Sequence, residues 1–230
     1  MKKVISWKRV AIIVVLVISC FGVWFIQFNI DLMKQKKLSE KLVEELIYFP
    51  SGKFLKPTLI EYQAAMSDLV WLRAIQYYGQ HLWSDRKFEW LNHIFDILTT
   101  LDTRFSNAYD FGSKMLAWDA KQVNEAEKLL NRGIINNPLD WQLTFDYAFI
   151  EYMKRQDYIT AGYYFEIASK LPNAWNVTER WAAFAFKKGG DNELAVEIWS
   201  SIYYTTKNSR LKELAERRLI ELGVKPKSQY

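Results

Sequence analysis

The sequence contains little cysteine, glycine and proline. A single cysteine excludes an intramolecular disulfide framework and any metal site built from several cysteines. Nine glycines and five prolines in 230 residues are too few for an all-β chain, which needs turns between many short strands. Half of the residues are hydrophobic and 16% are aromatic, which is ample for a packed core. Large rings suit stacked helical hairpins, where they fill the gaps between layers.

The marks of catalytic chemistry are also missing. The two histidines, His81 and His93, form no His-x-x-x-His motif, and both are expected to be packing or helix-surface residues. Gly189-Gly190 indicates a hairpin turn rather than a phosphate loop, because no Lys-Ser or Lys-Thr follows it. We therefore predict that the protein is not an enzyme and has no catalytic residue, metal site, cofactor or small-molecule substrate.

The net charge of +5 is concentrated at the two ends of the sequence. Residues 1–9 carry four Lys or Arg and no acidic residue, and residues 207–230 carry seven Lys or Arg against three Glu. Residues 10–206 are therefore mildly acidic, with a net charge of −3. A nucleic-acid partner needs a basic stripe along the folded domain, so none is expected.

Residues 10–30 contain no charged side chain. Twenty-one helical residues rise about 31 Å, which is enough to cross a hydrocarbon core of about 30 Å. We predict a transmembrane helix over 10–30, with the basic tail 1–9 in the cytoplasm and the following residues outside it. The expected localisation is a bacterial inner membrane, with a single pass and a periplasmic domain.

A second interpretation of this segment is a lipoprotein signal. Val17-Ile18-Ser19-Cys20 resembles the lipobox of bacterial lipoproteins, in which Cys20 would be the lipid attachment residue. The residues after Cys20 stay apolar, whereas lipoproteins usually turn polar there, so the spanning helix is favoured. No small-x-small cleavage site for an ordinary signal peptide is evident.

Residues 31–71 are predicted to form a stalk and lead-in helices. Leu38, Leu42, Leu46 and Ile47 recur at helical spacing between Lys and Glu residues. Pro50-Ser51-Gly52 is expected to end this amphipathic helix, and a further helix is expected to start near Pro57.

Residues 141–172 predict two short antiparallel helices, and the second carries a stripe of small and large residues on one face. This stripe recurs along the chain. Its first members are spaced by 35, 35 and 34 residues. The four triplets are Leu91, Phe95 and Leu98; Ala126, Leu130 and Gly133; Ala161, Phe165 and Ala168; and Ala195, Trp199 and Ile202.

Over residues 72–206 the pattern resembles the tetratricopeptide repeat (TPR), in a bacterial membrane-anchored form. Closing prolines stand at Pro138 and Pro172, and the Gly of the first helix falls at Gly79 and Gly112 but at Phe149 and Ala183 in the later repeats. The resemblance implies an all-α fold, namely an α-solenoid of about four helical hairpins after the transmembrane helix. The implied segments are repeats at 72–105, 105–140, 142–175 and 176–206, a capping helix at 207–222 and a tail at 223–230. An irregular all-helical domain is the alternative, although it would not be expected to keep this spacing.

The resemblance also implies a function. TPR proteins bind protein partners in a concave groove lined by the first helix of each hairpin. We therefore expect a non-catalytic scaffold that binds a protein partner and supports assembly of a cell-envelope complex. A stoichiometric structural subunit of a multisubunit membrane complex and an accessory lipoprotein of an envelope enzyme or a secretion or pilus system are the alternatives. The implied partner-binding residues are Gln76, Gln80, Tyr109, Ser113, Asp146, Ile150, Arg180 and Phe184.

Overall fold

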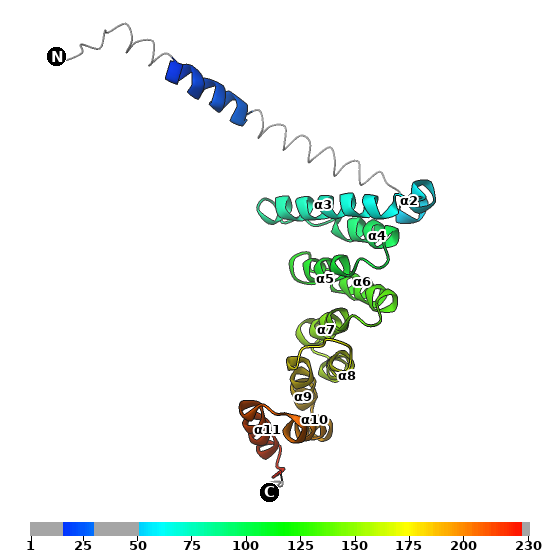
Figure 1. Cartoon of the computed structure of the whole chain (residues 1–230), viewed down its shortest axis with the longest axis vertical. Coiled ribbons are helices and arrows are strands. Elements are labelled where there is room, and N and C mark those ends of the chain that lie inside the picture. Colours follow the sequence, from blue (N-terminus) through cyan, green and yellow to red (C-terminus); the bar gives the residue numbers. More distant parts are fainter. Residues whose placement is uncertain (1–15, 30–50, 227–230) are drawn as a thin grey trace, which may run out of the picture. The chain divides into compact units, whose positions relative to one another are not determined.

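A computed structural model describes residues 16–29 and 51–226 (Figure 1). The chain divides into two compact units, Met1–Phe49 and Pro50–Tyr230. In the first unit, residues 16–29 are helical. Residues 10–15 and 30 of the predicted transmembrane helix lie outside the described residues, as do the tail 1–9 and the apolar stripe at 38–47. Among the helices described, none is both long enough and apolar enough to cross a membrane.

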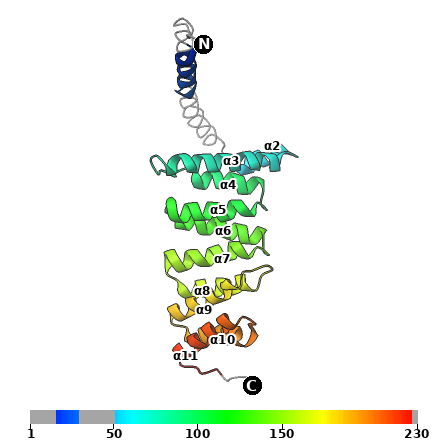
Figure 2. The same ribbon diagram turned by 60° about the vertical axis from the view of Figure 1, so that its left-hand side comes forward.

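The second unit is built from helices, and no strand occurs in the described part of either unit, which confirms the all-α class. Its elements follow the chain in this order: α2 (Gly52–Leu59), α3 (Gln63–Leu82), α4 (Leu91–Leu101), α5 (Ser106–Lys114), the π-helical η1 (Met115–Asp119), α6 (Val123–Asn136), α7 (Trp141–Ile150), the π-helical η2 (Glu151–Arg155), α8 (Tyr158–Ser169), α9 (Val177–Gly189), α10 (Asn192–Thr205) and α11 (Ser209–Glu221). Helices adjacent in the chain pack against one another, so the unit is a solenoid-like stack of hairpins (Figure 2).

The hairpins are α3–α4, α5–α6, α7–α8 and α9–α10, followed by α11. The first hairpin begins at Gln63, before the predicted start at residue 72, and α3 runs to Leu82 without a break. α2 lies ahead of it, contains Pro57 in its interior and ends before Ile60, which has a positive φ of 40°. The helix expected to start near Pro57 therefore starts earlier, at Gly52.

Local capping explains several helix boundaries. A side-chain oxygen that accepts a hydrogen bond from a backbone N–H satisfies a donor that the first helical turn leaves free. Side chains cap the starts of α7, α8, α10 and α11 in this way; they are Asp140, Asp157, Asp191 and Asn208. At the end of α9, Gly190 takes a left-handed φ of 89°, which costs little without a side chain. The turn predicted at Gly189-Gly190 thus joins α9 to α10.

The recurring triplets form the core. All of their members are buried, and they lie on the second helices α4, α6, α8 and α10. Trp199 and Phe165 are among the largest side chains that are fully buried. Small residues allow close helix contacts: a Cβ placed at Gly162 would come within 2.7 Å of the ring of Phe186 on α9.

Two of the Gly positions of the repeat pattern are not close contacts between helices. A Cβ placed at Gly79 would meet no atom within 4 Å, so none of the described helices packs closely on this glycine. In the third hairpin the small residue was expected at Phe149, but the fully buried small residue is Ala148, one position earlier. Phe149 stands 12 residues before Ala161. The same interval separates Gly79 from Leu91 and Ala183 from Ala195. In the third hairpin this interval includes η2, where i→i+5 hydrogen bonds place an extra residue in the turn.

Overpacking should show which side of a second helix faces the core. Ala195 on α10 is fully buried, whereas Glu193, two residues earlier, is exposed. Ala195→Leu adds bulk to a close contact and should lower the free energy of unfolding by about 1–3 kcal/mol. Glu193→Leu, the matched control, should change it by less than about 0.5 kcal/mol. Denaturant unfolding of both variants measures this, and equal losses would contradict the packing described.

Candidate partner-binding surface

The structure separates the predicted groove residues into three groups. Gln76 and Gln80 on α3 are exposed, and Arg180 and Phe184 on α9 are half-buried. The other four are buried inside the stack: Tyr109, Ser113, Asp146 and Ile150. The expectation that these four line an open face is therefore wrong.

Packing explains the buried positions. The ring of Tyr109 lies against Gly133 of α6, where a Cβ would come within 2.8 Å of it. Ser113 is fully buried, and its hydroxyl donates a hydrogen bond to the backbone carbonyl of Asp110. In the third hairpin the predicted positions Asp146 and Ile150 lie one residue too late, as Phe149 does, because η2 adds a residue before α8. Phe145 and Phe149, each one residue before a predicted position, are the half-buried ones.

These two phenylalanines belong to an aromatic ladder that runs between first helices. The ladder consists of Trp118 of η1, Phe145 and Phe149 of α7, and Trp181 of α9. Phe149 stacks on Trp118 with ring centroids 5.9 Å apart and meets Trp181 edge-on at 5.6 Å. Lys154 lies over the ring of Trp118 at 5.0 Å. Much of the face predicted as a groove is thus occupied by the chain's own rings, each contact adding about 0.5–1.5 kcal/mol beyond burial.

A polar cluster lies on the same helices, between α5 and α7. Lys114 forms an ion pair with Asp110 and also lies beside Asp146, whose Oδ2 is 3.2 Å from the Lys114 Nζ. Gln142 donates a hydrogen bond to Asp110 at 3.2 Å. Oδ2 of Asp146 has no partner in hydrogen-bond geometry, although the residue is only 6% exposed.

Burial and the contact between the two carboxyl groups determine the protonation states in this cluster. Burial, together with the hydrogen bond to Asp110, raises the pKa of Asp146 to about 8 in spite of the nearby Lys114. Burial also acts to raise the pKa of Asp110, but hydrogen bonds from Asp146, Lys114 and Gln142 outweigh it and hold that pKa below its usual range. At neutral pH the cluster therefore holds one carboxylate, one neutral carboxyl group and one ammonium.

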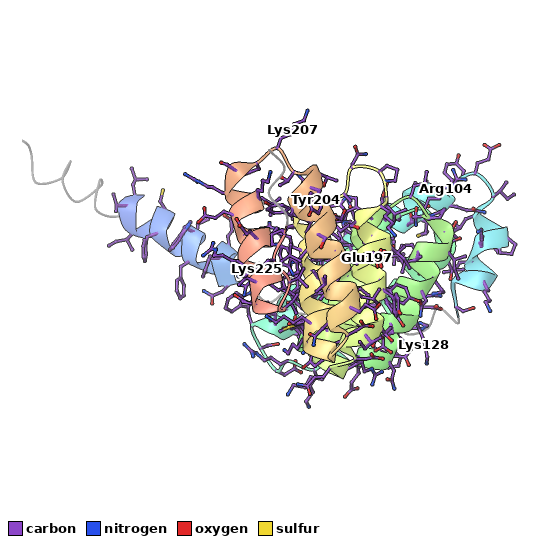
Figure 3. The ribbon with its side chains drawn as sticks, turned by 90° about the horizontal axis from the view of Figure 1, so that it is seen from below. Arg104, Lys128, Glu197, Tyr204, Lys207 and Lys225 are labelled. Carbon is purple, nitrogen blue, oxygen red and sulfur yellow. The ribbon has the colours of Figure 1, made fainter. Side chains whose placement is uncertain are left out.

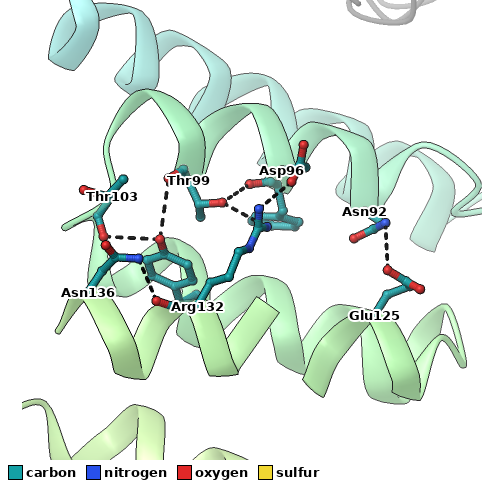
Figure 4. Close-up of polar contacts among 9 residues, drawn as sticks. Asn92, Asp96, Thr99, Thr103, Glu125, Arg132 and Asn136 are labelled. Atoms are coloured by element: carbon teal, nitrogen blue, oxygen red, sulfur yellow. Dashed lines mark hydrogen bonds and ion pairs between the residues drawn. The ribbon is translucent and has the colours of Figure 1, made fainter. Parts of the chain in front are cut away.

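The second helices present a different surface. Charged side chains such as Lys128 and Glu197 project from it into solvent (Figure 3). Between α4 and α6 the contacts are polar, with Arg132 Nη1 2.5 Å from Asp96 Oδ1 and Asn92 Nδ2 3.3 Å from Glu125 Oε2 (Figure 4). These contacts link adjacent hairpins, although an exposed ion pair such as Arg132–Asp96 adds little to stability.

The connections between hairpins expose large apolar side chains. Trp175, just before α9, is 67% exposed, and its ring centroid lies 5.2 Å from that of Trp141 at the start of α7. Leu139, in the connection that leads to α7, is 68% exposed. Ile135, in the last turn of α6, is exposed as well. We call Leu139, Trp141 and Trp175 the tryptophan edge.

Sequence reasoning missed both the aromatic ladder and the tryptophan edge. Phe145 and Phe149 stand four apart, and therefore on one helix face, which was a usable signal for the ladder. Nothing in the spacing of Trp175 indicates its exposure, because an isolated tryptophan in a turn can pack either way.

Comparisons with protein-family models, with curated proteins and with solved structures give no match to this chain. Within residues 16–29 and 51–226, no group of three His, Cys, Asp or Glu side chains could hold a metal ion. His81 contacts Asp85, with its Nδ1 2.6 Å from the carboxylate, and packs on Tyr77. The observations that bear on function are therefore those on the exposed surfaces, above all the tryptophan edge.

Proposed function

We propose that this protein is a TPR-like scaffold that binds another protein and has no catalytic activity of its own. Residues 10–30 anchor it in a bacterial inner membrane, and the hairpin stack lies outside the cytoplasm. The scaffold serves the assembly of a cell-envelope complex. The buried triplets at a spacing of 34–35 residues support the TPR-like interpretation.

The tryptophan edge carries the binding part of this proposal. Exposed apolar side chains that cluster, instead of lying singly, mark interaction sites on folded proteins. Tryptophan is enriched among the residues that contribute most to binding energy, because it buries a large rigid surface. Trp141 and Trp175 come from two successive hairpins, so a partner on the tryptophan edge would contact both. Lys114 and Asp110 on α5 add charge beside Gln142, the residue that follows Trp141.

Partner capture should depend on this edge. Full-length protein purified in mild detergent is used to capture envelope proteins, and the captured proteins are identified. We expect Leu139→Ala with Trp175→Ala to reduce capture of a stoichiometric partner at least tenfold, as loss of central apolar contacts does. Both side chains are mostly exposed, so the melting temperature should change by only a few degrees.

Tyr204→Ala is the matched control, because Tyr204 is an exposed aromatic residue on α10. It should leave capture unchanged. If the Leu139 and Trp175 double variant captures the same partner as the wild type, the tryptophan edge is not the binding site.

The aromatic ladder favours a second candidate, a stoichiometric structural subunit of a membrane complex. A face filled by the chain's own rings suits a fixed contact better than a reversible ligand. The two candidates differ in exchange: a labelled copy added to the isolated complex should replace a reversible scaffold within hours but should not replace a fixed subunit.

The anchor gives a separate prediction. If residues 10–30 span the membrane, the protein should resist extraction at alkaline pH, and its intact mass should include residues 1–30. The measurement is carbonate extraction followed by mass spectrometry of the mature protein. A mature chain that begins at a lipid-modified Cys20 would instead establish the accessory lipoprotein.

A further inference from the structure

The two ends of the hairpin stack differ in what they expose. At the last helix, α11, the exposed side chains are mainly charged: Lys212, Glu213, Glu216 and Arg217. This suits a terminal helix, which must present a polar outer face to water. At the first hairpin, α3 buries Val70, Ala74 and Tyr77 on one face. Its opposite face is largely apolar and open.

The open face of α3 has a regular spacing. Its positions alternate at intervals of three and four residues, which is the pattern of a two-helix seam. They are Tyr62 just before the helix, Ala65, Leu69, Leu72, Gln76 and Gly79 within it, and Trp83 just after it. Leu69 and Leu72 are each 56% exposed and Trp83 is 88% exposed. A Cβ placed at Gly79 would meet no atom within 4 Å. We call these seven residues the α3 seam.

We propose that the α3 seam pairs with the α3 seam of a second copy of this chain, in parallel. The helix is long enough for this, because 20 residues rise about 30 Å, nearly twice the length of its partner α4 with 11 residues. Leu69 and Leu72 would meet their own copies at the centre. Gly79 gives the two backbones room to approach, and Gln76 at a seam position would fix the register.

The charged residues beside the α3 seam indicate which molecule binds there and in which direction its helix runs. Asp68 and Arg73 are the only Asp, Glu, Lys or Arg residues in α3, and they flank the seam on opposite sides. Asp68 directly precedes the seam residue Leu69, and Arg73 directly follows the seam residue Leu72. In a parallel pair of helices, side chains at these flanking positions meet across the interface when they are five residues apart. Each copy therefore supplies Asp68 to the Arg73 of the other.

An antiparallel pair would bring like flanks together and leave the opposite charges apart. The exposure of the two residues permits the parallel contact: Asp68 is exposed and Arg73 is half-buried. Arg73 donates to Gln76 at 2.8 Å, which uses one of the five N–H donors of its guanidinium. Two symmetric ion pairs and a neutral, apolar centre thus fit a second copy.

Charge reversal tests the pairing in the full-length protein in mild detergent, with the dimer dissociation constant measured by sedimentation. The wild type should be a dimer. Asp68→Arg and Arg73→Asp, each alone, should raise the dissociation constant at least tenfold, because each places like charges opposite one another. The two changes together should restore it to within about threefold of the wild type. Glu197→Arg, on the exposed side of α10, should have no effect.

A monomeric wild type would overturn the proposal, and so would a dimer that ignores both single reversals, since it would be held elsewhere. Cross-linking then tests the direction. Cys20 is the only cysteine, so Cys20→Ser gives a clean background. Leu72→Cys should form a disulfide with its own copy in a parallel pair, whereas Lys128→Cys should not. A disulfide that forms only between Leu69→Cys and Leu72→Cys proteins would mean an antiparallel pair and would contradict the proposal.

Discussion

Phe165→Ala should lower the free energy of unfolding by about 3–5 kcal/mol, the range for removing a buried aromatic side chain. Phe165 on α8 is fully buried, and its ring lies 5.0 Å from Phe145 and 5.6 Å from Trp181. Those two residues come from α7 and α9, so one side chain joins two successive hairpins. Because native domains are stable by only about 5–15 kcal/mol, this loss should leave the chain close to unfolding.

Ile167→Ala is the matched control, since Ile167 lies on the same helix, two residues further on, and is 51% exposed. It should cost less than about 1 kcal/mol. Denaturant unfolding followed by tryptophan fluorescence measures both variants, and Trp181 reports directly on the site. A loss below about 2 kcal/mol for Phe165→Ala would mean that the hairpins do not depend on this contact.

The sequence predicted the second helices of the hairpins well. A stripe of small and large residues repeated every 34–35 positions, and each member proved to be buried. The physical reason is that a helix surrounded by its hairpin partner and the next hairpin must bury the same face in every repeat. The caps Asp157 and Asp191 were not predicted, although their signal is local, since each side chain accepts a hydrogen bond from a backbone N–H in the first turn of its own helix.

The first helices were predicted less well, because their register is not local. η1 and η2 end two of these helices with π-helical turns. Each turn contains one residue more than an α-helical turn, and no sequence pattern predicted it. A shift of one residue rotates a side chain by about 100° around the helix axis. That is enough to exchange a half-buried position for a buried one, as Phe149 and Ile150 illustrate. The repeat pattern made no prediction about the exposed face of α3, because it begins at residue 72, inside this helix.

Asp146→Asn should abolish a loss of stability that the wild type shows as pH rises from 4 to 9. The folded-state pKa of Asp146, about 8, is far above the ordinary value of 3.8. Between these two pH values the folded chain keeps a proton that the unfolded chain releases, so the stability of the wild type falls as pH rises. At about 1.36 kcal/mol per unit of pKa, a pKa difference of about 4 makes the fall on the order of 5 kcal/mol.

The asparagine should change little below pH 5, where Asp146 is protonated in the folded state. Its amide can still donate to Asp110 and accept from Lys114, so the cluster keeps its contacts. From about pH 5 upward the variant should be increasingly the more stable protein, because its side chain loses no proton when the chain unfolds. The difference should stop growing above about pH 8, where Asp146 ionises in the folded wild type as well. Neighbouring shifts do not disturb this comparison. The pKa of Asp110 is lowered and that of Lys114 is raised, so these two groups change the stability only below and above this pH window.

Thermal unfolding of both proteins at intervals from pH 4 to 9 measures the effect as the difference between two curves. Raised pKa values at Glu151 and Glu179 add pH dependence of the same sign, but they add it to both proteins and cancel in the difference. Parallel curves would mean that Asp146 is ionised in the folded state and fully paired with Lys114. A gap that widens toward alkaline pH would instead show that burial between α5 and α7 keeps this carboxyl group neutral, and that the face of the first helices carries less negative charge than its sequence suggests.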